Sequence, residues 1–352
     1  MTDSRKIRIA IDAMGGDHAP FSIIEGAVQA QKAYGKDVAL ILVGDSAIIK
    51  NDLKKLNSAD IQIRIVHSDE VIGMSDEPAE SVRTKKNSSI VVGMELQKNG
   101  ECDAFISAGN TGAVMAASLL ILGRLKGVNR PAIGIFFPNE KGRSLVLDVG
   151  ANSDCKAINL YQFAIMGSIY FSHMFSSKNP TVGLLSIGEE KSKGNELTIE
   201  SHKMISGADL NFIGNLEGRD ILKGRADVVV CDGFVGNIIL KFAESINSFF
   251  KESIRRKIKV NPFAQIGALL LKPAFRDLKK NLDYSEYGGA PLLGVNGVSI
   301  ICHGGSSAKA IRNAVVMART MVTENVNNHI EQRVKINGDN KSTETEIRQH
   351  NE

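Results

Sequence analysis

The sequence has no tryptophan and only 5% aromatic residues, and it lacks the marks of several protein classes. Its four cysteines, at positions 102, 155, 231 and 302, are far apart and form no Cys-x-x-Cys pair. This argues against a disulfide framework or a zinc site and favours a reducing cytoplasm. No apolar run approaches the ~20 residues that a helix needs to cross a bilayer. Any membrane contact is therefore expected to be peripheral.

A strong net charge is absent as well. The 43 basic and 39 acidic residues leave a formal charge of +4 over 352 residues, which argues against nucleic acid as a partner. The chain contains no His-Glu-x-x-His, no Walker lysine motif and no Gly-x-Ser-x-Gly, and its Gly15-Gly16 turn is not a dinucleotide fingerprint. We therefore expect no metal, no nucleotide and no other cofactor.

Glycine, by contrast, is abundant, with 33 residues that gather in turns. In the segment 103–118, a short apolar strand (103–107) leads into a glycine turn (108–112) and then into a helix of small residues. Backbone N–H groups in such a turn, and in the first turn of the helix, lack partners and attract anions. One turn of this kind is more often only a tight connection.

The same succession of strand, glycine turn and helix recurs along the chain. The other turns span residues 13–20, 149–152, 188–195, 232–237 and 303–307. In an open parallel sheet, the loops at the carboxyl ends of the strands line a shared crevice. We therefore expect the six turns to converge over one edge of the sheet around one oxygen-rich, anionic ligand.

The periodicity predicts an α/β fold. Strand, helix and strand follow one another within the first 44 residues, which is a βαβ unit with a parallel sheet. We expect one three-layer α/β/α domain over residues 1–327 with a mostly parallel sheet. Polar residues dominate from 328 to 352, where apolar periodicity stops, and this predicts a disordered tail.

A helical protrusion is predicted over residues 241–291. Between positions 251 and 280 there are nine basic and two acidic residues, a local charge of +7. Cations next to apolar side chains suit a segment that dips into anionic lipid headgroups. A dimer contact with a basic rim explains the pattern equally well, and the two are compatible. The predicted membrane or carrier-protein contacts are Arg255, Phe263, Ile266, Leu269, Leu270, Leu271 and Lys272.

Three polar side chains stand out as candidate ligands of an anion. Lys193 follows a strand end in the polar segment 189–196, where a lysine can meet an anion as a point charge. The amide of Asn237 could polarise a carbonyl group, and Arg83 could bind an anion near its neighbouring serines. Asn195 is interpreted as a helix cap.

Six motifs together resemble the bacterial phosphate acyltransferase (PlsX) family of phospholipid synthesis. They run in order from about residue 7 to 326, and the set is specific although each motif alone is weak: Asp12-Ala-Met-Gly-Gly-Asp17, Ser107-Ala-Gly-Asn-Thr-Gly112, Asp148-Val-Gly-Ala-Asn152, Lys193-Gly-Asn-Glu196, Asp232-Gly-Phe-Val-Gly-Asn237 and His303-Gly-Gly-Ser306.

The resemblance implies a fold similar to phosphotransacetylases and to isocitrate and isopropylmalate dehydrogenases. It also implies a homodimer at the inner face of the cell membrane that converts acyl-[acyl-carrier protein] and orthophosphate to acyl phosphate. A glycerol-phosphate acyltransferase would use that product. By the same resemblance, Lys193 and Asn237 would be catalytic, although Lys191 lies close enough to leave the choice of lysine open. The predicted phosphate- or substrate-binding residues are Asp12, Gly15, Gly16, Arg83, Gly109, Asn110, Thr111, Gly112, Asn152, Asp232, Gly304 and Ser306.

The chemistry fits the absence of a catalytic triad motif. Phosphate is largely ionised near neutral pH, with a second pKa of about 6 by analogy with phosphoserine. A thiol with a pKa of about 8.5 leaves as thiolate without a strong acid. We therefore expect direct attack by phosphate that is held by glycine-turn amides, while Lys193 offsets charge and Asn237 donates to the thioester oxygen. Two alternatives remain: a phosphotransacetylase-like enzyme that uses acyl-CoA, and a non-catalytic membrane-associated scaffold. The sequence leaves the acyl chain length open.

Overall fold

The computed structural model describes residues 5–58, 61–273 and 288–335. The first part of the chain forms β1 (Ile7–Asp12), α1 (Phe21–Tyr34), β2 (Val38–Gly44), α2 (Ser46–Lys55), β3 (Arg64–His67), α3 (Pro78–Thr84), α4 (Ser89–Lys98), β4 (Ala104–Ser107), α5 (Thr111–Ala117) and a π-helical turn, η1 (Ser118–Leu122).

The second part folds into another set of alternating elements before the chain returns to the first. It forms β5 (Ala132–Asn139), β6 (Gly142–Leu147), α6 (Ala157–Phe175), β7 (Thr181–Leu185), α7 (Glu196–Ser206), β8 (Asn211–Leu216), α8 (Gly218–Lys223), β9 (Val228–Val230), α9 (Gly233–Lys259) and α10 (Pro262–Leu270). The chain then returns through β10 (Ala290–Leu293), β11 (Val298–Ile301) and α12 (Ala308–Thr323).

The described strands form one sheet in the order β3-β2-β1-β4-β11-β10-β5-β6-β9-β7-β8. Alternate residues of β1 enter different cores, because successive strand side chains point to opposite faces: Ile9 and Ile11 join one, and Ala10 the other. Helices α1, α6 and α12 pack into the first core, and α4 and α5 into the second. The predicted three-layer α/β/α architecture is confirmed.

The direction of the strands divides the sheet into two groups. Seven neighbouring pairs are parallel. The three antiparallel pairs, β11–β10, β10–β5 and β5–β6, follow one another in the middle of the sheet. Three reversals leave β6, β7, β8 and β9 running opposite to β1, β2, β3, β4 and β11. The turns that follow the two groups therefore lie at opposite ends of the strands.

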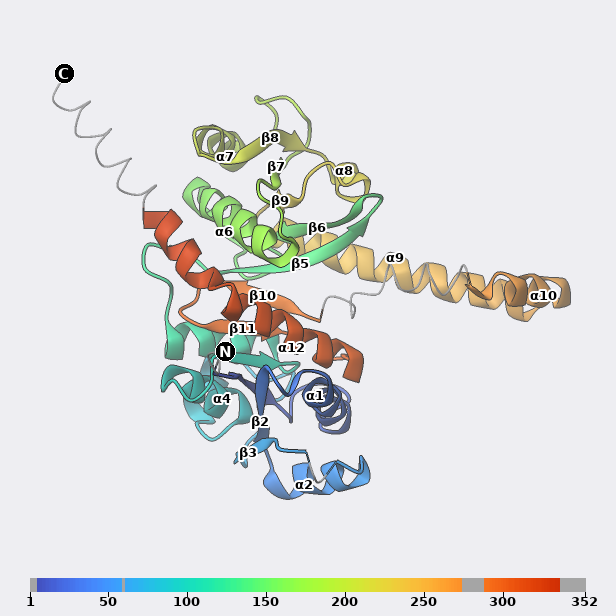
Figure 1. The fold of residues 1–352 in the computed structure, drawn as a ribbon. Coiled ribbons are helices and arrows are strands. Elements are labelled where there is room, and N and C mark those ends of the chain that lie inside the picture. Colours follow the sequence, from blue (N-terminus) through green and yellow to red (C-terminus); the bar gives the residue numbers. More distant parts are fainter. Residues whose placement is uncertain (1–4, 59–60, 274–287, 336–352) are drawn as a thin grey trace.

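The predicted protrusion is present in the structure. Figure 1 shows α9 and α10 extending away from the sheet. Apolar side chains along α10 are exposed, with Phe263 84% and Leu270 76% accessible. No helix of the described residues is long and apolar enough to cross a bilayer. Residues 274–287 of the predicted protrusion lie outside the described residues.

The predicted polar tail begins too early. Residues 326–335 are helical, and Val326, Ile330 and Val334 are buried in the larger core. Their spacing of four residues places them on one helical face. This apolar pattern is short, and the many polar residues around it make it hard to recognise in the sequence. The folded domain thus continues to at least residue 335. The rest of the predicted tail, 336–352, lies outside the described residues.

We predict that Ile330→Ala lowers the free energy of unfolding by about 2–4 kcal/mol, because it leaves a cavity in a packed core. Urea denaturation monitored by circular dichroism would measure the loss. Gln332→Ala, at an exposed position of the same helix, is the matched control and should change stability by less than about 0.5 kcal/mol. Equal stability of the two variants would contradict a core role for this helix.

Candidate active site

The six glycine turns form two sets rather than one. The N-terminal turn set comprises residues 13–20, 108–112 and 303–307, which follow β1, β4 and β11. The C-terminal turn set comprises residues 148–152, 186–195 and 232–237, which follow β6, β7 and β9. Because these two groups of strands run in opposite directions, the prediction that all six turns converge over one edge is wrong. The sequence could not reveal the reversal, because it depends on β10, which comes late in the chain and lies between β11 and β5, antiparallel to both.

Within the C-terminal turn set, the turns after β6 and β9 touch directly. The N–H of Gly233 donates to the carbonyl of Asn152 at 2.8 Å. A Cβ atom on Gly236 would lie 1.8 Å from the carbonyl oxygen of Asp148, so only glycine lets the first turn of α9 pack this closely. The approach also brings the side chain of Asn237 next to Gly150.

Asp148 organises the turn after β6. Its carboxylate is fully buried and accepts hydrogen bonds from the backbone N–H groups of residues 133, 150, 151 and 152 at 2.7–3.2 Å. Burial raises the pKa of this carboxyl above its ordinary value, although these hydrogen bonds act in the opposite direction. The amides of this turn are therefore engaged by the protein itself, and the expectation that they are free for an anion is wrong here.

Two further residues predicted to bind substrate also have structural partners. The side-chain amide of Asn152 donates to the carbonyl of Pro131 at 2.7 Å and to Asp148 at 2.9 Å. Asp232 caps α9 by accepting from the N–H of Val235 at 2.9 Å. These bonds fix the shape of the C-terminal turn set, and they leave its exposed side chains to meet a ligand.

Lys193 and Asn237 are such side chains. Lys193 lies on the turn after β7, and Asn237 lies near the start of α9, which follows β9. Because β7 and β9 are neighbouring parallel strands, both residues are at the same end of the sheet. Both residues are exposed. Lys193 is held by its backbone, through N–H to the carbonyl of Glu190 at 3.0 Å and through its carbonyl to the hydroxyl of Ser186 at 3.1 Å. Lys191 is also exposed on this turn. The structure confirms Asn195 as a cap, since it accepts from Thr198 at the start of α7.

The three turns of the N-terminal set pack on one another through their glycines. A Cβ on Gly15 would lie 2.7 Å from the backbone nitrogen of Gly109, and one on Gly16 would lie 2.9 Å from the carbonyl of Gly304. Asp12, which is buried, accepts from the hydroxyl of Ser107 at 2.7 Å. Burial raises its pKa as well. The candidates Thr111 and Ser306 also belong to this set, and Ser306 is buried.

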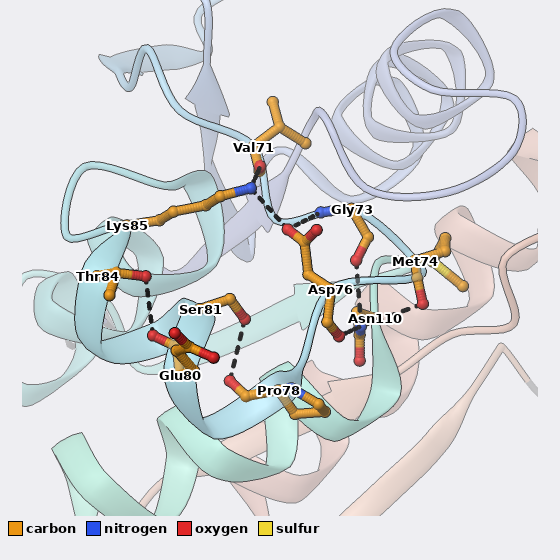
Figure 2. A network of polar contacts seen from close by, with 10 residues as sticks. All are labelled: Val71, Gly73, Met74, Asp76, Pro78, Glu80, Ser81, Thr84, Lys85 and Asn110. Atoms are coloured by element: carbon orange, nitrogen blue, oxygen red, sulfur yellow. Dashed lines mark hydrogen bonds and ion pairs between the residues drawn. The ribbon is translucent and has the colours of Figure 1, made fainter.

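Asn110 has a structural role that sequence reasoning missed. Its side-chain nitrogen donates to the carbonyls of Gly73, Met74 and Asp76 at 3.1–3.3 Å, and its oxygen caps α5 at Ala113. Figure 2 shows this amide bound to the segment 73–76. No local sequence signal links these positions, because they are more than 30 residues apart.

The same segment is fixed from its other side. Asp76 accepts from Lys85 at 2.6 Å, and Lys85 also donates to the carbonyl of Val71 at 2.9 Å (Figure 2). This pairing lowers the pKa of the Asp76 carboxyl. Gly112 is needed here, because a Cβ would lie 2.6 Å from Pro78 at the start of α3. Arg83 is exposed on α3.

The thiols are poorly suited to act as nucleophiles. Burial raises the pKa of Cys155 to about 11 and those of Cys102 and Cys302 to about 12, and it raises the pKa of Cys231 well above its usual range. Thiols with such pKa values carry almost no thiolate at neutral pH. Over the parts of the chain that the structure describes, no group of His, Cys, Asp and Glu side chains could hold a metal ion.

Comparisons with known proteins give a consistent result. A family model described as "Fatty acid synthesis protein" matches residues 7–329. The phosphate acyltransferase of Geotalea daltonii is 49% identical over 331 residues, covering 94% of this chain and 95% of the relative. That of Heliobacterium modesticaldum is 54% identical over 320 residues, covering 91% and 95%.

Among solved structures, a phosphotransacetylase from Streptococcus pyogenes aligns with a TM-score of 0.63 at 19% identity, covering 91% of this chain and 95% of that one. The EutD phosphotransacetylase from Staphylococcus aureus aligns with a TM-score of 0.59 at 17% identity, covering 90% and 94%. At such low identity, the likeness concerns the fold.

The buried carboxyl of Asp148 predicts a pH dependence of stability. Because its pKa is raised on folding, the folded state holds the proton at pH values where the unfolded state has lost it. The free energy of unfolding of the wild type, relative to Asp148→Asn, should therefore rise as the pH falls from 7 towards 4, by at most about 1.4 kcal/mol per pH unit. Urea titrations of both proteins across this range would measure it. A difference that stays constant with pH would count against a raised pKa.

Proposed function

The chain belongs to the phosphate acyltransferase family, and from this premise we propose that it transfers a fatty acyl group from acyl-[acyl-carrier protein] to orthophosphate. Membership of the family supports acyl transfer to phosphate. The carrier-protein donor, and an acyl phosphate product destined for phosphatidic acid synthesis, are our proposal. The observation that carries it is the position of Lys193 and Asn237, which are both exposed, one on the turn after β7 and one near the start of α9 after the neighbouring parallel strand β9.

We propose direct attack on the thioester. An oxygen of orthophosphate bonds to the carbonyl carbon, the carbonyl oxygen becomes an oxyanion, and the carbon–sulfur bond then breaks. The leaving thiolate takes a proton from solvent. Lys193 and Asn237 donate hydrogen bonds to the developing oxyanion and to the phosphate, which lowers the energy of the charged transition state. The raised thiol pKa values argue against a cysteine acyl-enzyme.

The protrusion favours a carrier protein and a membrane surface over acyl-CoA as the context of the reaction. Apolar side chains on α10 are exposed, and Arg255 and Lys272 are exposed near them in the chain. Such a surface suits peripheral binding at the cytoplasmic face of the membrane. There a glycerol-phosphate acyltransferase could take the acyl phosphate. The acyl-CoA rival rests on the fold shared with phosphotransacetylases.

A homodimer forms part of the same proposal. The first turns of α9 carry exposed apolar side chains four residues apart, Phe234 (61%), Ile238 (52%) and Phe242 (65%). An apolar stripe of this kind on a protruding helix suits the same stripe of a second copy.

The N-terminal turn set remains a proposed substrate-binding surface. The exposed side chain of Met74 lies beside Gly304, which gives this set an apolar rim. An apolar rim suits the acyl donor better than phosphate. Arg83 and the backbone of residues 109–112 stay candidates for this contact, although the side chains of Asp12 and Asn110 are already engaged.

The decisive assay is phosphate-dependent release of thiol by the purified protein. We expect rapid release from acyl-carrier protein and slow release from acyl-CoA. Lys193→Ala and Asn237→Ala should each lower turnover by about a hundredfold or more, because each removes a donor to the oxyanion. Both variants should keep the circular dichroism spectrum of the wild type. Lys191→Ala is the matched control and should stay active.

Three results would contradict this proposal. Faster turnover with acyl-CoA would favour the phosphotransacetylase-like rival. Unchanged function in both alanine variants would favour a non-catalytic scaffold. Isolation of a kinetically competent acyl-cysteine would exclude direct attack.

The membrane proposal predicts that Leu270→Glu weakens flotation with vesicles of anionic phospholipid about tenfold or more, since burying a leucine is worth about 2 kcal/mol and the new charge is repelled. Leu222→Glu makes the same change at an exposed leucine of α8 and should float like the wild type. Equal flotation of the two variants would leave the protrusion without a membrane role.

A further inference from the structure

Strand order places a fourth segment beside the C-terminal turn set. The sheet runs β5-β6-β9-β7, and β5 is antiparallel to β6, so β5 begins at the end where β6, β9 and β7 finish. The residue just before Pro131 and β5 is Arg130, which is exposed. At this end of the sheet, Arg130 thus lies on the β5 side of the set and Lys193 on the β7 side, with Asn237 near the start of α9, which follows β9 between them.

The backbone around Arg130 is tied to the turn after β6. The carbonyl of Pro131 accepts from the side chain of Asn152 at 2.7 Å, and the N–H of Ile133 donates to Asp148 at 3.0 Å. The N–H of Val149 donates to the carbonyl of Ile133 at 3.0 Å. These three contacts fix the position of Arg130 relative to the turn that touches Asn237.

The loop that leads to Arg130 is clamped as well. Gln162, a buried residue of α6, accepts from the N–H of Asn129 and donates to the carbonyl of Gly127, both at 2.8 Å. Arg124 donates to the carbonyl of Asn129. Because these contacts already order the loop, the binding of a ligand by Arg130 would cost little conformational entropy.

The surroundings call for a cation at this place. Asp148 and Asp232 both belong to the C-terminal turn set, and their carboxylates would repel an incoming phosphate. No carboxylate within the described residues forms an ion pair with Arg130. Its positive charge acts next to the set, on the Cys155 thiol, which contacts the carbonyl of Asn152. There it opposes the larger effects of burial and of the two carboxylates on the thiol pKa.

We propose that Arg130 is a phosphate-binding residue of the reaction, which holds orthophosphate on the β5 side while Lys193 and Asn237 act from the other side. A guanidinium matches two phosphate oxygens at once and stays charged at every working pH. This inference rests on the proposed function and adds a residue that sequence reasoning did not single out.

The test compares three variants of the full chain in the thiol-release assay with acyl-carrier protein. Arg130→Ala should raise the KM for phosphate about ten- to hundredfold, the effect of losing hydrogen bonds to a charged group, and leave the KM for the acyl donor within about twofold. Arg130→Lys should have a KM for phosphate between those of the wild type and Arg130→Ala, because lysine keeps the charge but cannot bind two phosphate oxygens as a guanidinium does. Lys126→Ala, an exposed cation of the same loop, is the matched control and should behave as wild type.

Calorimetric titration with inorganic phosphate, without donor, gives a second measurement that is independent of turnover. Arg130→Ala should weaken phosphate binding by a similar factor, and Lys126→Ala should not. An unchanged phosphate affinity and KM in Arg130→Ala, or a rise confined to the KM of the acyl donor, would overturn the inference. If the wild type itself releases no thiol in response to phosphate, the proposed function fails instead.

Discussion

Strand direction is the constraint on which the arrangement of this molecule depends. A turn lies at the end of the strand it follows, so only strands that run the same way can bring their turns together. Three successive antiparallel pairings in the middle of the sheet give one net reversal of strand direction, and this splits six similar turns into two sets. The same reversal brings the start of β5 to the ends of β6, β9 and β7. Arg130 thereby lies beside the C-terminal turn set, although the sequence around it is not a glycine turn after a strand.

Each set is organised by a buried aspartate at or just after a strand end. Asp12 and Asp148 accept hydrogen bonds from their own turns and from neighbouring strands, and burial raises the pKa of both. A carboxylate held in this way satisfies the backbone N–H groups that an empty glycine turn would leave free. The glycines serve mainly to let turns approach one another. Ligand contacts therefore fall to exposed side chains and to amides that the aspartates leave unengaged.

Helix α9 joins two proposed roles in one rigid element. Asn237 lies near its N-terminal end, and α10 follows its far end. With 27 residues, α9 is about 40 Å long at 1.5 Å per residue. If α10 lies at a membrane surface, this length sets how far the proposed catalytic edge stands from the lipid.

The sequence by itself determined the layers, most of the strands and helices, the protruding segment and the family, because periodicity and short motifs are local properties. It also proposed Lys193 and Asn237 as candidate catalytic residues, because they stand next to glycines in recognisable motifs. Only the tertiary structure decided which turns meet. It also showed that the side-chain amides of Asn110 and Asn152 donate to carbonyls far away along the chain, and that Ile330 and Val334 belong to the core. It alone brought Arg130 to the proposed site. The reason is physical: strand direction and the partners of a buried amide are set by residues far away along the chain, and no local pattern records them.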